Sequence, residues 1–152
     1  MTEQTPHPIP TKTFLANLFS APDLESFIKN NSDVMKIPEF HAYLSHLCKS
    51  LGHIPEQIIK SSGIERTYGH QLFNGTRNPS RDKVIQLAIG LGLNVEETQR
   101  LLIIAQRNTL YPKFKRDAII LHCIKNKRNI FETQSVLQDL GLTLLSGDEK
   151  YG

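Results

Sequence analysis

The segment between Pro55 and Ser80 limits the fold of this chain more than any other. A short helical pattern from Glu56 to Ser62 stops at Gly63, and a second pattern runs from Ile64 to about Phe73. Glycine adopts a left-handed backbone at little energetic cost, so Gly63 can make a tight turn between two helices. The segment therefore predicts two short helices joined at an angle by a glycine-containing turn.

Two helices joined in this way are typical of the helix-turn-helix unit, which places its second helix in the major groove of DNA. Ile58, Ile64 and Leu72 are spaced to face the apolar space between the two helices. The N-terminal half of such a second helix is the part that reaches base edges. On its outer face and flank lie the candidate base-reading residues Arg66, Thr67, His70 and Gln71.

Positive charge is concentrated in two parts of the 152-residue chain, although its net charge is only +3. Residues 55–83 carry five basic and three acidic residues, and residues 108–129 carry six basic residues and one acidic residue. Contact with a phosphate backbone needs such local positive charge. For the second segment, a docked helix with a solvated basic rim is the alternative interpretation.

Helical periodicity recurs along the whole chain, with no strand alternation and no repeat of fixed period, and predicts an all-α fold. Helix starts are expected at Ser20, Pro38 and Ser80, and at Asn94 with Glu97 as a capping box. The expected parts are a disordered arm (1–12), a helical extension (13–37), a helix-turn-helix domain (38–107), a C-terminal helical subdomain (108–145) and a flexible tail (146–152).

Two further expectations concern the later helices. The helix that starts at Asn94 should continue to Arg107, and its apolar run from Leu101 to Ala105 predicts burial on more than one side. In the basic segment, Arg116 and Asp117 form a candidate internal ion pair or cap.

The sequence from Gly63 to Ala88 resembles the Xre-type, or phage-repressor-like, helix-turn-helix family. The resemblance is carried by Gly63-Ile64, Arg66-Thr67-Tyr68, Gln71-Leu72-Phe73-Asn74-Gly75, Arg77-Asn78-Pro79-Ser80 and Val84-Ile85-Gln86-Leu87-Ala88. It implies a five-helix domain over about 39–107, with extra helices on both sides.

The resemblance also implies a function, because members of this family bind operator DNA as dimers through the second helix of the motif. By position, Arg66, Thr67 and Gln71 correspond to base readers, with His70 beside them. The expected phosphate contacts are Lys60, Tyr68, Asn74, Arg77 and Arg81.

Two positions depart from the family pattern in opposite directions of volume. Ile59 stands where alanine is usual, and Gly69 stands where an aliphatic residue is usual. Glycine inside a helix costs roughly 1 kcal/mol relative to alanine, so a packing reason is expected. We predict that Ile59 fills the space left open at Gly69. Pro55 replaces the polar residue that often caps the first helix and contacts phosphate.

Other functional classes find little support in the residues. His41, His46, Cys48 and His53 lack the spacing of a zinc site, so neither a metal nor another cofactor is expected. No catalytic constellation is evident, and we expect the protein not to be an enzyme. No apolar run approaches membrane-spanning length, and no secretory signal precedes the first helix, which predicts a cytoplasmic protein. Cys48 and Cys123 are expected to be buried thiols.

The sequence leaves two functional hypotheses. The first is a dimeric, sequence-specific DNA-binding regulator of transcription that inserts residues 64–73 into the major groove. The alternative is an antitoxin-like or adaptor protein that binds a protein partner through its terminal helices, since those helices supply more apolar surface than a five-helix domain requires.

Overall fold

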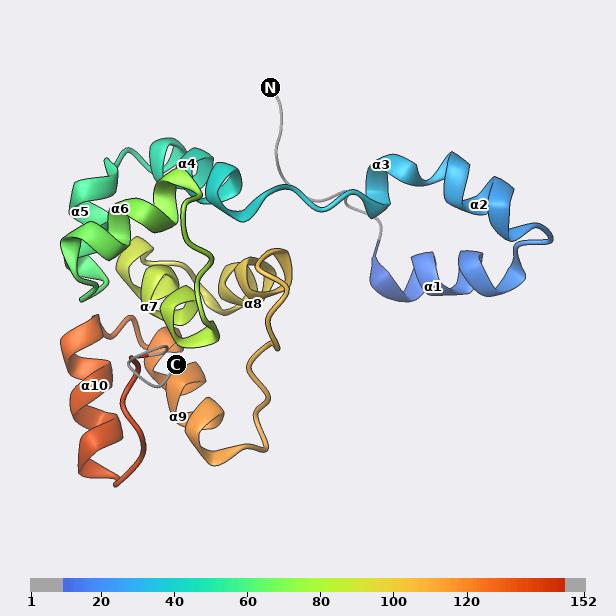
Figure 1. Cartoon of the computed structure of the whole chain (residues 1–152). Coiled ribbons are helices and arrows are strands. Elements are labelled where there is room, and N and C mark those ends of the chain that lie inside the picture. The colour runs from blue at the N-terminus through green and yellow to red at the C-terminus, as the bar shows by residue number, and fades with distance from the viewer. Residues whose placement is uncertain (1–9, 147–152) are drawn as a thin grey trace. The chain divides into compact units, whose positions relative to one another are not determined.

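The computed structural model describes residues 10–146, and this range is built from helices and contains no strand (Figure 1). The all-α prediction is therefore confirmed for the described residues. The chain divides after Pro38 into two compact units, residues 1–38 and 39–152. The predicted subdomain at 108–145 lies within the second unit.

The first unit is a small helical hairpin with little buried apolar surface. Its helices are α1 (Thr11–Ser20), α2 (Leu24–Asn30) and α3 (Ser32–Met35). The Phe14 and Phe27 rings pack 5.5 Å apart between centroids, and Phe27 is the hydrophobic residue of this unit that is buried among the described residues.

Three details of this unit differ from expectation. Helix α1 begins at Thr11, inside the predicted arm, and residues 1–9 of that arm lie outside the described residues. The cap of α2 is Asp23 rather than Ser20, because the Asp23 carboxylate accepts hydrogen bonds from both the N–H and the hydroxyl of Ser26. Helix α3 was not expected from the sequence.

The second unit holds the remaining helices and ends, as far as it is described, at Ser146. Residues 147–152 of the predicted tail lie outside the described residues. The helices are α4 (Phe40–Ser50), α5 (Pro55–Ser61), α6 (Arg66–Asn74), α7 (Arg81–Leu91), α8 (Val95–Ile104), α9 (Lys115–Lys125) and α10 (Ile130–Asp139).

Three of these bounds correct the sequence-based ones. Helix α4 begins at Phe40 rather than Pro38, and α6 begins at Arg66 rather than Ile64. Helix α8 ends at Ile104 rather than Arg107. The predicted cap at Ser80 and the capping box of Asn94 with Glu97 are both confirmed.

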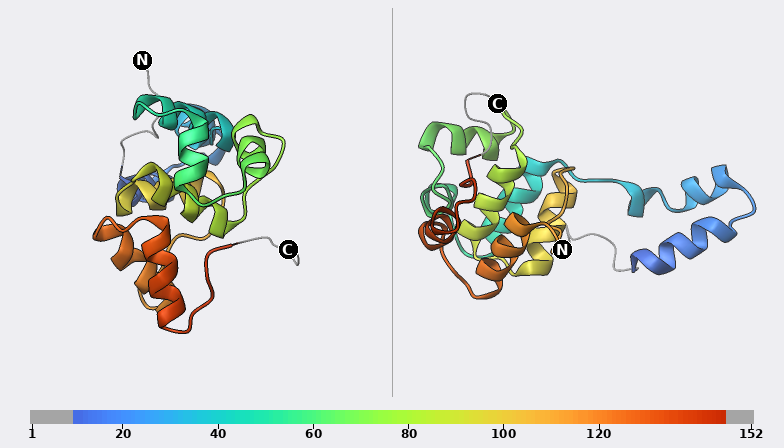
Figure 2. Two further views of the ribbon diagram at one scale, coloured as in Figure 1. Left: turned by 90° about the vertical axis from the view of Figure 1, so that its left-hand side faces the viewer. Right: turned by 90° about the horizontal axis from the view of Figure 1, so that it is seen from below.

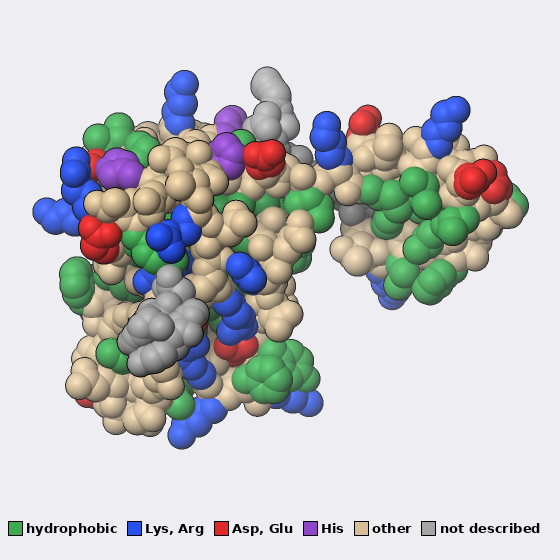
Figure 3. All heavy atoms as spheres, in the orientation of Figure 1, with side chains coloured by type: hydrophobic (Ala, Val, Ile, Leu, Met, Phe, Trp, Pro, Cys, Tyr) green, Lys and Arg blue, Asp and Glu red, His purple; other side chains and the backbone are tan. Residues whose placement is uncertain are grey.

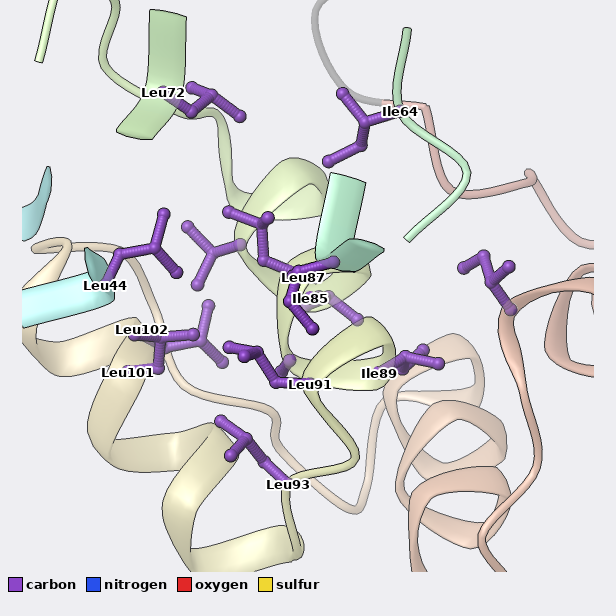
Figure 4. Close-up of a cluster of buried hydrophobic side chains, with 14 of the residues drawn as sticks. Leu44, Ile64, Leu72, Ile85, Leu87, Ile89, Leu91, Leu93, Leu101 and Leu102 are labelled. Carbon is purple, nitrogen blue, oxygen red and sulfur yellow. The ribbon is translucent and has the colours of Figure 1, made fainter. Parts of the chain in front are cut away.

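Helix α7 lies at the centre of this unit and packs against α5, α8 and α10. Its side chains meet those of α4, α6 and α8 in one apolar core, in which Leu44, Leu72 and Leu87 are fully buried (Figure 4). Within the predicted apolar run, Leu101, Leu102 and Ile104 are at most 5% exposed, whereas Ile103 is 58% exposed. Leu102 and Ile104 point to nearly opposite sides of the helix, and α8 packs against both α7 and α9, so the expectation of burial on more than one side is confirmed.

Both cysteines are buried in the second unit as free thiols, as the sequence predicted. Burial raises the pKa of the Cys48 thiol and of the Cys123 thiol. Because the thiolate is the reactive form, both groups are poorly reactive where they stand.

The second unit contains an internal repeat, which corrects the expectation that there is none. Residues 81–110 form a first hairpin (α7 and α8), and residues 116–145 form a second hairpin (α9 and α10), 35 positions later. Ten of the thirty aligned positions are identical, and in the first hairpin they are Arg81, Asp82, Ile85, Ile89, Asn94, Glu97, Thr98, Gln99, Leu102 and Leu110.

The two hairpins also share their internal hydrogen bonds. Gln99 binds both backbone groups of Leu110 at 2.8 Å, and Gln134 binds both backbone groups of Leu145 at 2.7 and 2.8 Å. The capping box that starts α8 is repeated at the start of α10. The repeat is therefore one of structure as well as of sequence.

Reciprocal ion pairs join the two hairpins. Arg81 binds the Asp117 carboxylate at 3.2 and 2.9 Å, and Arg116 binds the Asp82 carboxylate at 3.1 and 2.9 Å. The predicted pairing of Arg116 with its neighbour Asp117 was wrong. Each hairpin gives the other the same two residues, which is the self-complementary arrangement of a two-fold interface. Further views show α9 and α10 packed together beside α7 (Figure 2).

Candidate nucleic-acid interface

The turn between α5 and α6 has the geometry that the sequence predicted. Gly63 has a φ of +70°, in the left-handed region. Ile58, Ile64 and Leu72 are at most 6% exposed and belong to the apolar core of the second unit. Side chains from both helices therefore fix how α6 leaves the turn.

A close contact between the two helices explains both departures from the family pattern. A Cβ atom placed on Gly69 would lie 2.6 Å from Ile59 Cγ1 and 2.9 Å from Ile59 Cδ1, far inside normal contact. Ile59 itself is 2% exposed. The predicted exchange of volume between positions 59 and 69 is confirmed, because the isoleucine side chain occupies the space beside the glycine.

The four candidate base-reading residues lie on the accessible side of α6. Arg66 and Thr67 are exposed, and the Arg66 side chain keeps 73% of its surface accessible. His70 and Gln71 are half-buried one turn later. The opposite side of the helix carries Gly69, Leu72 and Phe73, which are buried.

An acidic residue of α5, which the sequence gave no reason to select, contacts two of these candidates. The Glu56 carboxylate accepts from Arg66 Nε at 2.9 Å and lies 2.7 Å from His70 Nε2. The hydrogen bonds to His70 and then to Arg66 lower the pKa of Glu56. Its negative charge and these contacts therefore persist at pH values below those at which a glutamate usually becomes protonated. Glu56 therefore pairs with both side chains, although most of the Arg66 side chain stays accessible.

A second carboxylate caps α6. Glu65 accepts from the backbone N–H groups of Tyr68 at 2.9 Å and Thr67 at 3.0 Å, and these bonds lower the pKa of Glu65. The negative charge stabilises the positive end of the helix dipole. Glu56 and Glu65 therefore make the N-terminal end of α6 less positive than Arg66 alone suggests.

The far end of the exposed face is cationic. The Arg77 guanidinium lies 4.6 Å and the Lys83 ammonium 5.4 Å from the centroid of the Tyr68 ring, within the range of cation–π contacts. Arg77 Nε also donates to Gln71 Oε1 at 3.1 Å. We call Tyr68, Gln71, Arg77 and Lys83 the cationic edge. Lys83 was not among the predicted site residues, although Arg81, on the same helix α7, was.

Two further predicted phosphate contacts, Lys60 and Asn74, are exposed. Asn74 ends α6, and its Oδ1 accepts from Thr76 N–H at 2.8 Å, which shapes the turn through Gly75. Lys60 is exposed in the last turn of α5. Both residues can reach solvent without disturbing the core.

Arg81 has a structural role that its position in the motif does not suggest. Besides binding Asp117, its guanidinium donates to the backbone oxygens of Asn108 and Thr109, both at 2.8 Å. The Asp117 side chain is only 5% exposed, and the Arg81 side chain is 27% exposed. Four donor contacts hold this arginine inside the fold, which argues against the predicted phosphate contact.

No match to this chain is found among protein-family models, curated proteins or solved structures. Within residues 10–146, histidine, cysteine and acidic side chains form no group of three or more that could hold a metal ion. None of the helices described in that range is long and apolar enough to cross a membrane.

Proposed function

We propose that the second unit binds double-stranded DNA by inserting α6 into the major groove, and that the protein regulates transcription. One observation carries the proposal: α6 buries one face in the core while Arg66, Thr67, His70 and Gln71 stand on the accessible side, next to the cationic edge. A helix of this kind fits the width of the major groove. The similarity of residues 63–88 to Xre-type regulators supports the same function.

The roles divide along the helix. Arg66 and Gln71 have the side chains that recognise guanine and adenine edges, whereas Arg77, Lys83 and Lys60 suit phosphate oxygens. Binding would exchange the contacts of Arg66 and His70 with Glu56 for contacts with the bases. A dimer would place two copies of α6 about 34–36 Å apart, on half-sites one helical turn apart.

Selection of bound duplexes from a random pool tests the proposal directly. We expect one enriched sequence whose affinity falls steeply with salt, because phosphate contacts release counterions. Arg66→Ala should relax the preference at one base position, whereas Arg77→Ala should weaken binding to cognate and random duplexes alike. Recovery of no preferred sequence by the folded protein would refute sequence-specific binding.

Glu56→Gln should change duplex affinity in the opposite direction. It removes a negative charge from the proposed interface and weakens the hold on Arg66, so duplex affinity should rise. The matched control is Glu96→Gln, which removes an exposed carboxylate from α8, away from α6. If Glu56→Gln left duplex affinity unchanged at low salt, the N-terminal end of α6 would not lie against the duplex.

A second candidate function is binding of a protein partner through the first unit. That unit exposes large hydrophobic residues, namely Leu15, Phe19, Leu24, Ile28 and Met35, with Phe19 77% exposed. Hydrophobic side chains gather on the face of it that Figure 3 displays. An adaptor of this kind would give weak, sequence-blind binding in the same duplex selection.

A further inference from the structure

The two hairpins of the second unit differ in what they hold. On the first hairpin, Gly90 of α7 lies directly against Ser62: a Cβ at position 90 would stand 2.9 Å from the Ser62 nitrogen and 3.0 Å from its Cα. Gln86, one turn earlier, donates from Nε2 to the Ser62 oxygen at 3.2 Å. The backbone of the turn between α5 and α6 is thus held on α7.

The second hairpin closes the other side of this turn. Ile130, at the start of α10, would contact a Cβ on Gly63 at 3.4 Å through its Cγ1 atom. The Ser62–Gly63 turn therefore lies between the end of α7 and the start of α10. We call this arrangement the occupied site.

The 35-residue repeat defines a counterpart of the occupied site, formed by the end of α9 and the start of α8. There, Lys125 corresponds to Gly90, Val95 to Ile130 and Lys127 to Gly92. Lys125, Val95 and Lys127 line a groove of about 360 Å³. Its complete lining is Asn94, Val95, Glu96, Ile124, Lys125 and Lys127, and we call it the open groove.

The side chains of the open groove show what it is suited to bind. Lys125 and Lys127 are exposed and outnumber the one acidic residue, Glu96, while Val95 and Ile124 give it an apolar floor. Lys127 has a φ of +57°, where its counterpart Gly92 has +72°. Gln106, just after α8, has a φ of +59° as well, so a left-handed residue is the ordinary end of a helix here. The difference between the two sites is that the second has a lysine side chain at this position.

We propose that the open groove binds an acidic segment of a partner protein, which lies further from the helix backbone than Ser62–Gly63 does in the occupied site, because Lys125 and Leu121 replace Gly90 and Gln86. Small residues of the segment lie on Val95 and Ile124, and an aspartate or glutamate beside them pairs with Lys125 and Lys127. The inference does not depend on DNA binding by α6, because none of the groove residues belongs to the candidate interface.

Display of random twelve-residue peptides on phage, selected against the full-length protein, tests the inference. We expect enrichment of peptides in which Asp or Glu adjoins Gly, Ala or Ser. Synthetic copies of them should lose about tenfold or more in affinity for Lys125→Glu, the effect of converting one charge-assisted contact into a repulsion. The control is Lys113→Glu, a reversal of an exposed lysine outside the groove, which should leave affinity unchanged.

Three results would overturn the inference. One is failure to select any peptide that distinguishes the protein from Lys125→Glu. Another is equal binding of scrambled peptides, which would show charge attraction without a shaped site. The third is a loss of duplex affinity in Lys125→Glu with peptide binding unchanged, since the groove would then contact nucleic acid. Because Lys125 is exposed, circular dichroism should show the same fold for both variants.

Discussion

The first and second hairpins have the same framework but opposite surroundings. In the first, seven of the eleven residues of α7 are buried, because the helix packs against α5 on one side and α8 and α10 on the others. In the second, α9 buries four residues, and the positions equivalent to Leu87, Gly90 and Leu91 carry His122, Lys125 and Asn126, all exposed. Among the residues that both copies kept are the arginine and the aspartate that join the two hairpins.

This difference teaches that a repeated fold need not repeat a function. The capping boxes, the glutamine clamps and the Arg–Asp pairs depend only on the hairpins themselves, so both copies retain them. Gln86, Gly90 and Lys83 serve the first hairpin's contact with α5 and α6, and the second hairpin has Leu121, Lys125 and Ala118 at those places. The first hairpin supports α6, and the second supports the first.

The largest effects should come from the reciprocal ion pairs. Arg81→Ala leaves Asp117, 5% exposed, without its ion-pair partner and should reduce the free energy of unfolding by about 3 kcal/mol. Arg116→Ala removes the ion pair with Asp82, whose side chain is 16% exposed, and should reduce the free energy of unfolding by less, about 2 kcal/mol. Urea unfolding of the two variants measures the difference. Equal and negligible losses would show that the pairs do not hold the hairpins together.

A smaller effect should distinguish the two equivalent positions 90 and 125. Gly90→Ala drives a methyl group into the backbone of Ser62 and should destabilise the protein by about 2 kcal/mol. Lys125→Ala alters an exposed side chain and should change stability by less than about 0.5 kcal/mol. Thermal melts of both variants test the comparison. A stable Gly90→Ala variant would mean that the occupied site is looser than the structure indicates.

The contact at Gly69 should respond less than the one at Gly90, because a side chain rather than backbone opposes it. Gly69→Ala gains about 1 kcal/mol of helix propensity and loses more to the clash with Ile59, for a net cost of about 1 kcal/mol. Combining it with Ile59→Ala, which removes both γ carbons that oppose the new methyl group, should cost less than the sum of the two single changes in a double-mutant cycle. If Gly69→Ala alone raised the melting temperature, that result would contradict the close contact between Gly69 and Ile59.

The smallest change in stability should come from Lys83→Ala, which gives the first hairpin the residue of the second. Stability should change by less than about 0.5 kcal/mol, because Lys83 is only half-buried and its ammonium lies over the Tyr68 ring rather than in the core. If the cationic edge contacts phosphate, duplex affinity should fall several-fold for all sequences and the salt dependence should decrease by about one counterion. Fluorescence anisotropy at several salt concentrations checks both. An unchanged salt dependence would exclude Lys83 from the interface.

Much of the fold could be predicted from local patterns. The left-handed turn at Gly63, the cap at Ser80 and the capping box at Asn94 are set by residues a few positions apart. The packing of Ile59 on Gly69 could be predicted as well, because two opposite departures from a family pattern suggested a compensating pair. The repeat was missed, although the similarity of residues 94–99 (NVEETQ) to residues 129–134 (NIFETQ) was a visible signal.

The candidate site was less accessible to such reasoning. Glu56 contacts Arg66 and His70, ten and fourteen residues away, and no local rule selects it. Lys83 belongs to α7 but contacts Tyr68 of the site. Arg81 was expected in the site but binds Asp117, 36 residues further along the chain. Each depends on how two helices are placed relative to each other, which side-chain periodicity does not specify.

The sequence by itself determined the helical class, the positions of most helices and which face of α6 is buried, because these follow from turn chemistry and apolar spacing within a few residues. Only the tertiary structure decided which arginine is committed to the core and which is accessible, and which copy of the repeated hairpin holds a turn. Those outcomes depend on ion pairs and close contacts between residues far apart in the chain. Their energies exist only once the helices have packed.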